Sequence, residues 1–237
     1  GTDTATVTVT INGSDDAPTI VAVSDVDDSG NELIDFEGGD DTITLSGLPV
    51  NTAAGTDVTV EFWMNWDGVD NVMPFGFGNY DLWLNGGYFG FNTANGDLYG
   101  MSSTGLATGW HHISAVFRNG DVTGSRLIID GVEQTLSQLL GTPSNGNAVA
   151  TSTALISGWG NNVAYKFDGQ IDQVRIWNGG RSETSVRADM FNELSGPQTG
   201  LVASYSFSGA TTGAGGVIDD SGNGHHGTMG GMTAANV

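Results

Sequence analysis

The chain has 237 residues, and six Lys and Arg stand against 27 Asp and Glu, which gives a formal net charge of −21. A surface of this sign repels phosphate backbones and anionic lipids, so binding to nucleic acids or membrane surfaces is disfavoured. The absence of cysteine excludes disulfides, thiol catalysis and thiolate metal sites. No signal peptide and no apolar run of membrane-spanning length is found.

The predicted elements begin with a strand over residues 4–12, where Val and Ile alternate strictly with Thr. Turn residues and a proline end this strand by residue 18. A new domain is predicted to begin at residue 19. Its first strands lie in 34–45, on either side of a Gly-Asp turn, and in 57–66, where alternation predicts a strand covered on both faces.

Short strands joined by tight turns continue along the rest of the chain, as the abundance of glycine favours. Asp130 and Gly131 stand between two apolar runs and predict a tight turn. One helix is predicted over 181–194, with Ser182 as its N-cap. The further strands are predicted over 73–78, 80–91, 97–103, 109–120, 125–135, 154–160, 167–178 and 200–209.

About a dozen short strands with one short helix predict an all-β fold of two packed antiparallel sheets. Within 167–178, Ile171, Val174 and Ile176 are predicted to fill the core. Arg175 is one of only six cations, and we expect it to pair with a nearby carboxylate.

Several motifs occur in one order between residues 30 and 230, including "VTVEFWMNW", "GWHHISAVFRNG", "FDGQIDQVRIWNGGRSETSVR" and "DDSGNGHHGT". The ordered set resembles the laminin-G-like branch of the concanavalin A-like lectin/glucanase fold, a relative of the pentraxins. The resemblance implies a two-sheet antiparallel jelly-roll sandwich whose binding loops gather at one rim or on the concave face.

The preceding segment, "DTATVTVTINGSDDAP", resembles the last strand and linker of the Ig-like extender repeats of large bacterial RTX adhesins. Two units are therefore expected, an extender tail over 1–18 and the sandwich domain over 19–237. In that family Ca²⁺ stiffens the junctions between repeats, which makes Asp15 and Asp16 candidate ligands.

In the pentraxin relatives, oxygen ligands for Ca²⁺ lie just before the strand equivalent to 167–178, and an Asp-Asn pair follows an early strand. Carried onto this chain, the resemblance makes Asn161, Asn162, Asn79 and Asp81 candidates for one oxygen-rich site. Because no acidic residue stands between Trp159 and Asn162, the negative charge that Ca²⁺ needs has to come from Asp81 or Asp70. The alternative is that the asparagines serve only as turn residues.

Aromatic side chains accompany these polar residues. A sugar ring stacks its C–H face on an aromatic plane, while its hydroxyls need amide or carboxylate partners. The predicted ligand-binding set is therefore Trp159, Asn161, Asn162, Asn79, Tyr80 and Asp81.

A second acidic loop, over 219–228, predicts a structural Ca²⁺ site, with a plain Gly-Asn turn as the alternative. The family places this motif near the first strand pair, so Asp40 or Asp41 is expected close by. The adjacent His225 and His226 diverge along an extended chain, which argues against zinc. The predicted metal ligands are Asp81, Asn161, Asp219, Asp220, Asn223, Asp40 and Asp41.

Catalysis is not expected, because Glu32, Asp35 and Glu37 do not match the alternating carboxylates of retaining glucanases. The sequence therefore predicts a non-catalytic, Ca²⁺-assisted lectin-like adhesion domain. It would be a monomeric domain within a long extracellular adhesin at the bacterial cell surface, and it would recognise glycans on another cell or on a matrix. The alternatives are a module for peptide or protein ligands, a structural spacer and, last, a glucanase-type glycoside hydrolase.

Overall fold

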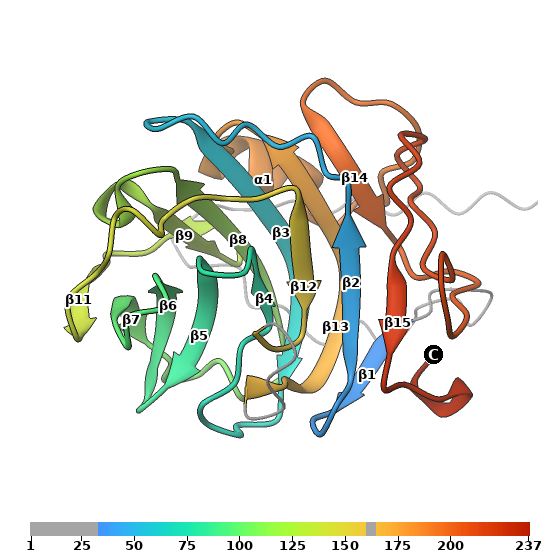
Figure 1. Cartoon of the computed structure of the whole chain (residues 1–237), viewed down its shortest axis with the longest axis horizontal. Helices are drawn as coiled ribbons and strands as arrows, with labels where there is room; N and C mark the ends of the chain where they lie inside the picture. Colours follow the sequence, from blue (N-terminus) through green and yellow to red (C-terminus); the bar gives the residue numbers. More distant parts are fainter. Residues whose placement is uncertain (1–32, 160–164) are drawn as a thin grey trace, which may run out of the picture.

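The computed structural model describes residues 33–159 and 165–237, so the predicted extender tail lies outside the described residues. The described chain forms two antiparallel sheets and one α-helix, as predicted (Figure 1). One sheet has eight strands, in the order β11-β7-β6-β5-β4-β12-β2-β15. Its strands are β2 (Thr42–Ser46), β4 (Phe75–Gly76), β5 (Asp81–Asn85), β6 (Tyr88–Asn92), β7 (Leu98–Ser102), β11 (Ser137–Leu140), β12 (Thr153–Ile156) and β15 (Thr228–Gly230).

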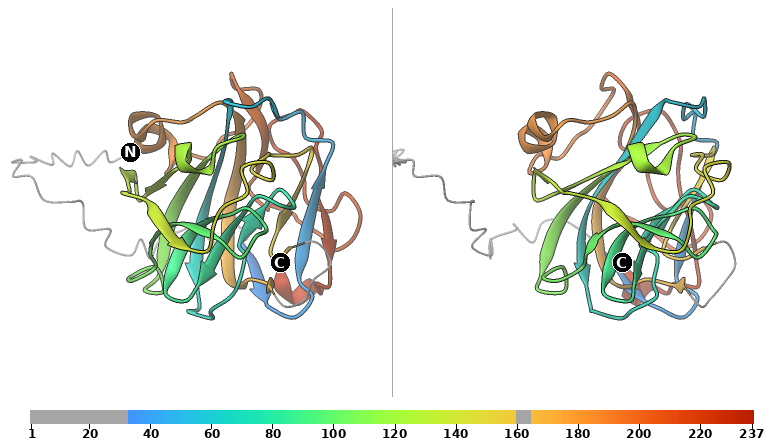
Figure 2. Two further views of the ribbon diagram at one scale, coloured as in Figure 1. Left: turned by 60° about the vertical axis from the view of Figure 1, so that its left-hand side comes forward. Right: turned by 90° about the vertical axis from the view of Figure 1, so that its left-hand side faces the viewer.

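The other sheet has seven strands, in the order β1-β13-β3-β8-β9-β10, and β14 also pairs with β13. Its strands are β1 (Ile34–Glu37), β3 (Asp57–Trp66), β8 (Trp110–Arg118), β9 (Arg126–Ile129), β10 (Val132–Glu133), β13 (Asp168–Asn178) and β14 (Leu201–Tyr205). Helix α1 (Glu183–Asp189) packs Val186 and Met190 on Ile128, on the side of this sheet that faces away from the core (Figure 2). The 3-10 helices η1 (Val122–Gly124) and η3 (Ala234–Asn236) complete the described elements.

Alternation in β3 fills the core as predicted. Val58, Val60 and Met64 are fully buried between the sheets. Thr59 and Glu61, which point to the opposite side, are also buried, so β3 is covered on both faces. The alternation in the sequence therefore gives both the strand and its inward side.

A bulge in β13 explains how Ile171 and Val174, three positions apart, both face the core. The register shifts between Asp172 and Arg175, and Gln173 takes a left-handed φ of 49°. The extra residue moves Val174 and Ile176 onto the same side as Ile171, and all three are fully buried, as predicted.

The predicted pairing of Arg175 with a carboxylate is found only at longer range, through the charges of Glu61, Asp189 and Asp172. Its guanidinium is buried and donates to the backbone carbonyls of Asp189 and Asn192 and to the side chain of Gln173. No ion pair of Arg175 with a carboxylate is found among the described residues. Because Arg175 binds carbonyls at the end of α1, the helix stops at Asp189 instead of running to 194.

The turn at Asp130 and Gly131 is confirmed. Both residues have positive φ, 52° and 75°, and they join β9 to β10 with Ile129 opposite Val132. The helix N-cap is confirmed as well, because the Ser182 hydroxyl accepts a hydrogen bond from the Ser185 amide. Within residues 33–159 and 165–237, no helix has the length and apolar character needed to cross a membrane.

Candidate functional site

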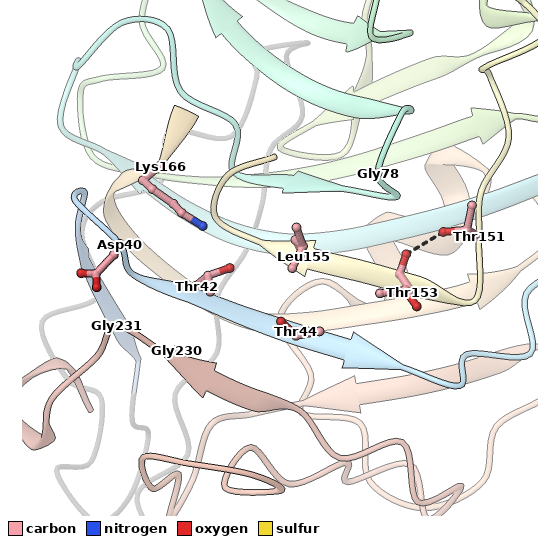
Figure 3. Close-up of a pocket in the computed structure, with 10 residues that line it drawn as sticks. All are labelled: Asp40, Thr42, Thr44, Gly78, Thr151, Thr153, Leu155, Lys166, Gly230 and Gly231. Carbon is pink, nitrogen blue, oxygen red and sulfur yellow. Dashed lines mark hydrogen bonds between the residues drawn. The ribbon is translucent and has the colours of Figure 1, made fainter. Parts of the chain in front are cut away.

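A pocket of about 480 Å³ lies on the outer face of the eight-stranded sheet, the face turned away from the core (Figure 3). The pocket is formed by side chains that alternate with core residues along the strands and therefore point outward. On β2 and β12, Ile43 and Ile156 point into the core, while Thr44 and Leu155, which pair across the two strands, point outward. Glycines at its border keep it open. The lining residues are Asp40, Thr42, Thr44, Gly78, Thr151, Thr153, Leu155, Lys166, Gly230 and Gly231.

The four threonine hydroxyls of the pocket differ in whether they form hydrogen bonds within the protein. Thr42 donates to the carbonyl of Ser157 at 2.9 Å, and Thr151 donates to the carbonyl of Thr153 at 2.7 Å. The side-chain hydroxyls of Thr44 and Thr153 make no hydrogen bond to any other described residue, and neither is fully buried. Both hydroxyls can therefore donate to and accept from a ligand.

Lys166 reaches the pocket from the loop before β13. Its side chain is 6% exposed, and its ammonium lies 3.4 Å from the Ser157 carbonyl (Figure 3). A Cβ at position 158 would lie 2.8 Å from the ammonium nitrogen, so Gly158 leaves the space that the lysine occupies. Burial lowers the pKa of Lys166, and the charges of Asp40 and Asp41 partly offset this effect.

An aromatic group lies on the same outer face, and two of its members, Trp159 and Tyr165, are chain neighbours of Gly158 and Lys166. It consists of Trp83, Trp159 and Tyr165, with ring centroids 6.1 Å apart for Trp159–Tyr165 and 6.3 Å apart for Trp83–Tyr165. Trp83 points outward from β5, because Leu82 and Leu84 on either side of it fill the core. Trp159 and Tyr165 remain partly exposed. The aromatic group therefore places apolar rings on the same face of the sheet as the hydroxyls.

Asp81 points outward from the start of β5 and leans over Gly76 of the neighbouring strand β4. A Cβ at Gly76 would lie 1.8 Å from one carboxylate oxygen of Asp81, so only glycine fits there. The Asp81 side chain is 1% exposed, and neither oxygen has a hydrogen-bond partner among the described residues. Burial raises the pKa of Asp81 well above its usual value, because the charged form loses water and gains no hydrogen bond of normal geometry in exchange.

An unpartnered buried carboxylate is the kind of group that a cation would satisfy, so Asp81 fits the role of a Ca²⁺ ligand. Among the described residues, however, no three Asp, Glu, His or Cys side chains come together as a metal site. Asp81 would therefore be the charged member of a set completed by neutral oxygens or water. Asn79 is exposed, two residues before Asp81, and Asn161 and Asn162 lie outside the described residues.

Tyr80 is not available to a ligand. It is fully buried, packs on Phe117 at a centroid distance of 4.9 Å, and bonds through its hydroxyl to Ser125 and to the Arg118 carbonyl. Burial also raises the pKa of its hydroxyl. Neighbouring side chains in extended chain point to opposite sides, so Tyr80 enters the core where Asp81 faces outward. The structure therefore places Trp159 and Asp81 on the outer face and removes Tyr80 from it.

The acidic loop at 219–226 is held by its own hydrogen bonds. The Asp219 carboxylate accepts from the amides of Ser204, Ser221 and His225 and from the Ser221 hydroxyl. Burial alone would raise the pKa of Asp219, but these donors outweigh it and the pKa lies below its usual value. With four protein donors in place, Asp219 acts as the organiser of a turn.

The other predicted ligands of this loop are also engaged by the protein. Asp220 accepts from the Ser206 amide, and the Asn223 side chain donates to the carbonyls of Leu201 and Val202. No joint metal cluster of this loop with Asp40 and Asp41 exists in the part of the chain that the structure describes.

Asp41 instead closes the turn between β1 and β2. It accepts from the Glu37 amide and the Asn236 side chain. Burial raises the pKa of Asp41. Asp40 is exposed at the Lys166 end of the pocket.

Comparison with known proteins agrees with this architecture. The profile of a laminin G-type family, described as the concanavalin A-like lectin/glucanases superfamily, matches residues 37–187. No curated protein matches the sequence.

Among solved structures, the fold is similar to that of a Bacteroides ovatus protein provisionally described as carbohydrate-binding. The TM-score is 0.60 at 20% identity, over 86% of this chain and 59% of the other. This likeness establishes the fold and no more, and the chain spans less than two thirds of that protein.

Two further structures resemble the chain more distantly. Domains LG4-5 of the mouse laminin alpha1 chain align with a TM-score of 0.42 at 12% identity, over 66% of this chain and 46% of the other. A SAP-like pentraxin from Limulus polyphemus aligns with a TM-score of 0.43 at 13% identity, over 65% and 79% respectively. Because the matching profile spans more than half of its residues, this chain belongs to the laminin G-type family of the concanavalin A-like lectin/glucanases superfamily.

Proposed function

We propose that this domain is a non-catalytic, lectin-like module that binds carbohydrate on the outer face of the eight-stranded sheet. The observation that carries the proposal is the pocket itself, whose Thr44 and Thr153 hydroxyls are not used by the fold and lie on the same face as Trp159 and Tyr165. A sugar needs both kinds of surface, polar partners for its hydroxyls and a flat apolar surface for its C–H face. The carbohydrate-binding description of the Bacteroides ovatus protein supports the same function.

A binding role fits the pocket better than hydrolysis. Glycoside hydrolysis of the usual kind needs two carboxyl groups on either side of the scissile bond. Among the described residues that line the pocket, Asp40 is the single carboxylate. Asp35 and Glu37 lie on β1, in the other sheet.

Calcium is proposed to assist binding through Asp81. Its unpartnered carboxylate would supply negative charge, and Asn79, Asn161 and Asn162 are the proposed neutral ligands. The bound ion would supply positive charge to sugar hydroxyls and would order the ends of the loops that carry it. The Asp219 loop is left out of this proposal, because protein donors already satisfy its carboxylate.

We further propose that the domain works outside the cell, within a bacterial surface adhesin of the RTX type. This rests on the resemblance of residues 3–18 to the end of an extender repeat. A module of this kind would carry its glycan-binding face at a distance from the cell that displays it.

The proposal is tested on a glycan array, probed with the whole chain in Ca²⁺ and again in chelator. Thr44→Val and Thr153→Val together remove the two unused hydroxyls while keeping side-chain shape, and Thr199→Val on an exposed loop is the matched control. We expect glycan signals that weaken with chelator, disappear in the double variant and persist in the control. A double variant that folds and binds as well as the wild type would refute the site. Silence on glycans with signal on a peptide array would favour a protein ligand, and silence on both would favour a spacer.

A further inference from the structure

We propose that the pocket selects saccharides that carry a carboxylate, such as hexuronic acids, and that Lys166 provides the positive charge that recognises it. This inference rests on the proposed function and names the class of sugar that the same site takes. Lys166 is the single cation among the described residues that line the pocket.

The six Lys and Arg residues differ in whether they contact a carboxylate. Four arginines form ion pairs with carboxylates, and Arg175 is bonded to two carbonyls and to Gln173. Lys166 forms no ion pair within the described residues, and its ammonium makes one long hydrogen bond there, of 3.4 Å to the Ser157 carbonyl. Although the chain has 27 acidic residues, no carboxylate among the described residues neutralises the charge of Lys166 by contact. The four paired arginines are Arg118, Arg126, Arg181 and Arg187.

Burial makes this lysine a strong anion receptor. An ammonium has three donors, and Lys166 uses one of them on Ser157 while its side chain is only 6% exposed. A desolvated cation gains more from a contacting carboxylate than a solvated one, because water no longer competes for the charge. Figure 3 shows the ammonium extending over the pocket toward Thr42 and Leu155, where a bound sugar would lie.

The charge of the whole chain works against anions, and this limits how the pocket can bind them. The formal net charge of −21 repels an acidic sugar at long range, and Asp40 stands at the Lys166 end of the pocket. Asp40 is exposed, however, and solvent with salt screens its charge over roughly 8–10 Å. Contact with the buried ammonium is screened much less, so affinity for the carboxylate has to come from contact at Lys166 and not from steering.

The shape of the pocket also fits a sugar acid better than an inorganic anion. Leu155 supplies an apolar floor between Thr44 and the glycine of β4, and the unused hydroxyls lie farther from Lys166 (Figure 3). A hexuronic acid can set its carboxylate on Lys166 and its ring over Leu155. Its remaining hydroxyls then reach Thr44 and Thr153.

The test compares matched neutral and acidic sugars, namely galactose with galacturonic acid and glucose with glucuronic acid, each as short oligomers in calorimetric titrations. Lys166→Met keeps the aliphatic stem and removes the charge. Arg126→Met makes the same change of net charge on β9 of the other sheet, so it is the matched control. Circular dichroism and thermal melting establish that each variant folds.

We expect the wild type and Arg126→Met to bind at least one uronate about tenfold or more tightly than its neutral partner, a difference of about 1.4 kcal/mol. Lys166→Met is expected to lose this preference, so that each uronate binds no more tightly than its neutral partner. Equal or weaker binding of the uronates by the wild type would overturn the inference, even if Lys166→Met failed to fold. Binding of neutral sugars alone would overturn the inference and leave the proposed function standing, whereas absence of binding to any saccharide would overturn both.

Discussion

Replacing Asp81 by asparagine should stabilise the Ca²⁺-free domain. The carboxylate is 1% exposed and has no partner for either oxygen among the described residues, so its negative charge is buried without compensation. Asparagine has nearly the same shape and sits equally well over Gly76, but it carries no charge. In the presence of Ca²⁺ the order should reverse, because the variant loses the one charged ligand proposed for the ion.

The size of the stability change follows from the free-energy costs of burying a carboxylate and of burying an amide at position 81. An unpaired buried carboxylate costs several kcal/mol, whereas an unpartnered amide costs about 1–3 kcal/mol. The exchange should therefore stabilise the metal-free chain by about 2 kcal/mol, which raises Tm by about 4–8 °C for a domain of this size. Ca²⁺ at a hundred times its Kd would stabilise the wild type by about 2.7 kcal/mol and leave the variant unchanged.

The raised pKa of Asp81 also determines how the stability of the metal-free chain changes with pH. Burial raises the pKa of Asp81 in the folded chain above its ordinary value of 3.8. The folded chain therefore binds this proton more tightly than the unfolded chain does, and the resulting stabilisation is complete at pH values below 3.8. This stability is lost as the pH rises through the folded-state pKa. The metal-free wild type should therefore lose stability over this pH range relative to Asp81→Asn.

Differential scanning calorimetry in chelator and in excess Ca²⁺ measures both effects, with Asp67→Asn as a control at an exposed carboxylate. Destabilisation by Asp81→Asn in chelator would show that the carboxylate has a partner that the structure does not contain. An equal rise of Tm with Ca²⁺ in wild type and variant would remove Asp81 from the metal site.

Three further predictions test the assignment of roles. Trp159→Ala should leave the fold intact, since the side chain is partly exposed, and abolish binding on the glycan array; unchanged binding would remove Trp159 from the site. Tyr80→Phe should cost about 1 kcal/mol of unfolding free energy in urea titrations, through loss of the bonds to Ser125 and Arg118, and should leave glycan binding unchanged; a loss of binding would return Tyr80 to the site. Asp219→Ala should cost at least about 3 kcal/mol, through loss of four charge-assisted hydrogen bonds, and should leave the Ca²⁺ response intact. Because the folded-state pKa of Asp219 is lowered, the stability it supplies is lost as the pH falls through that pKa, and a melt series at acidic pH that shows no such loss would contradict its role.

Strands and tight turns were predictable because their signals are local. Alternation in 57–66 marks both the strand and its inward side, and Asp130-Gly131 marks a turn that needs two positive φ angles. The bulge at Gln173 has no such signal, since glutamine is not a residue that favours left-handed backbone. The fold was therefore predictable, while the path of one strand within it was not.

The candidate site was less predictable, because it depends on which residues far apart in sequence share one face. Tyr80 and Asp81 are neighbours in a polar turn sequence, and only the position of β5 shows that one enters the core and the other faces outward. Lys166 belongs to no sequence motif. Its proposed role depends on its place in the pocket and on the absence of an ion pair with any described carboxylate, and both appear only in the structure. The outward threonines of β2 and β12 carried a weak signal, because they alternate with Ile, Leu and Ala as on a half-covered sheet.

The central claim is that saccharides bind in the pocket on the outer face of the eight-stranded sheet, and filling that pocket tests it most directly. Gly230 lines the pocket from β15 with an ordinary backbone conformation, and a Cβ there would meet Thr42 at 3.3 Å, so Gly230→Gln adds a side chain without backbone strain. Thr199→Gln, on an exposed loop outside the pocket lining, is the control. In calorimetric titrations with the strongest glycan from the array, we predict that Gly230→Gln loses binding and Thr199→Gln retains it. Full affinity in a folded Gly230→Gln variant would contradict the claim.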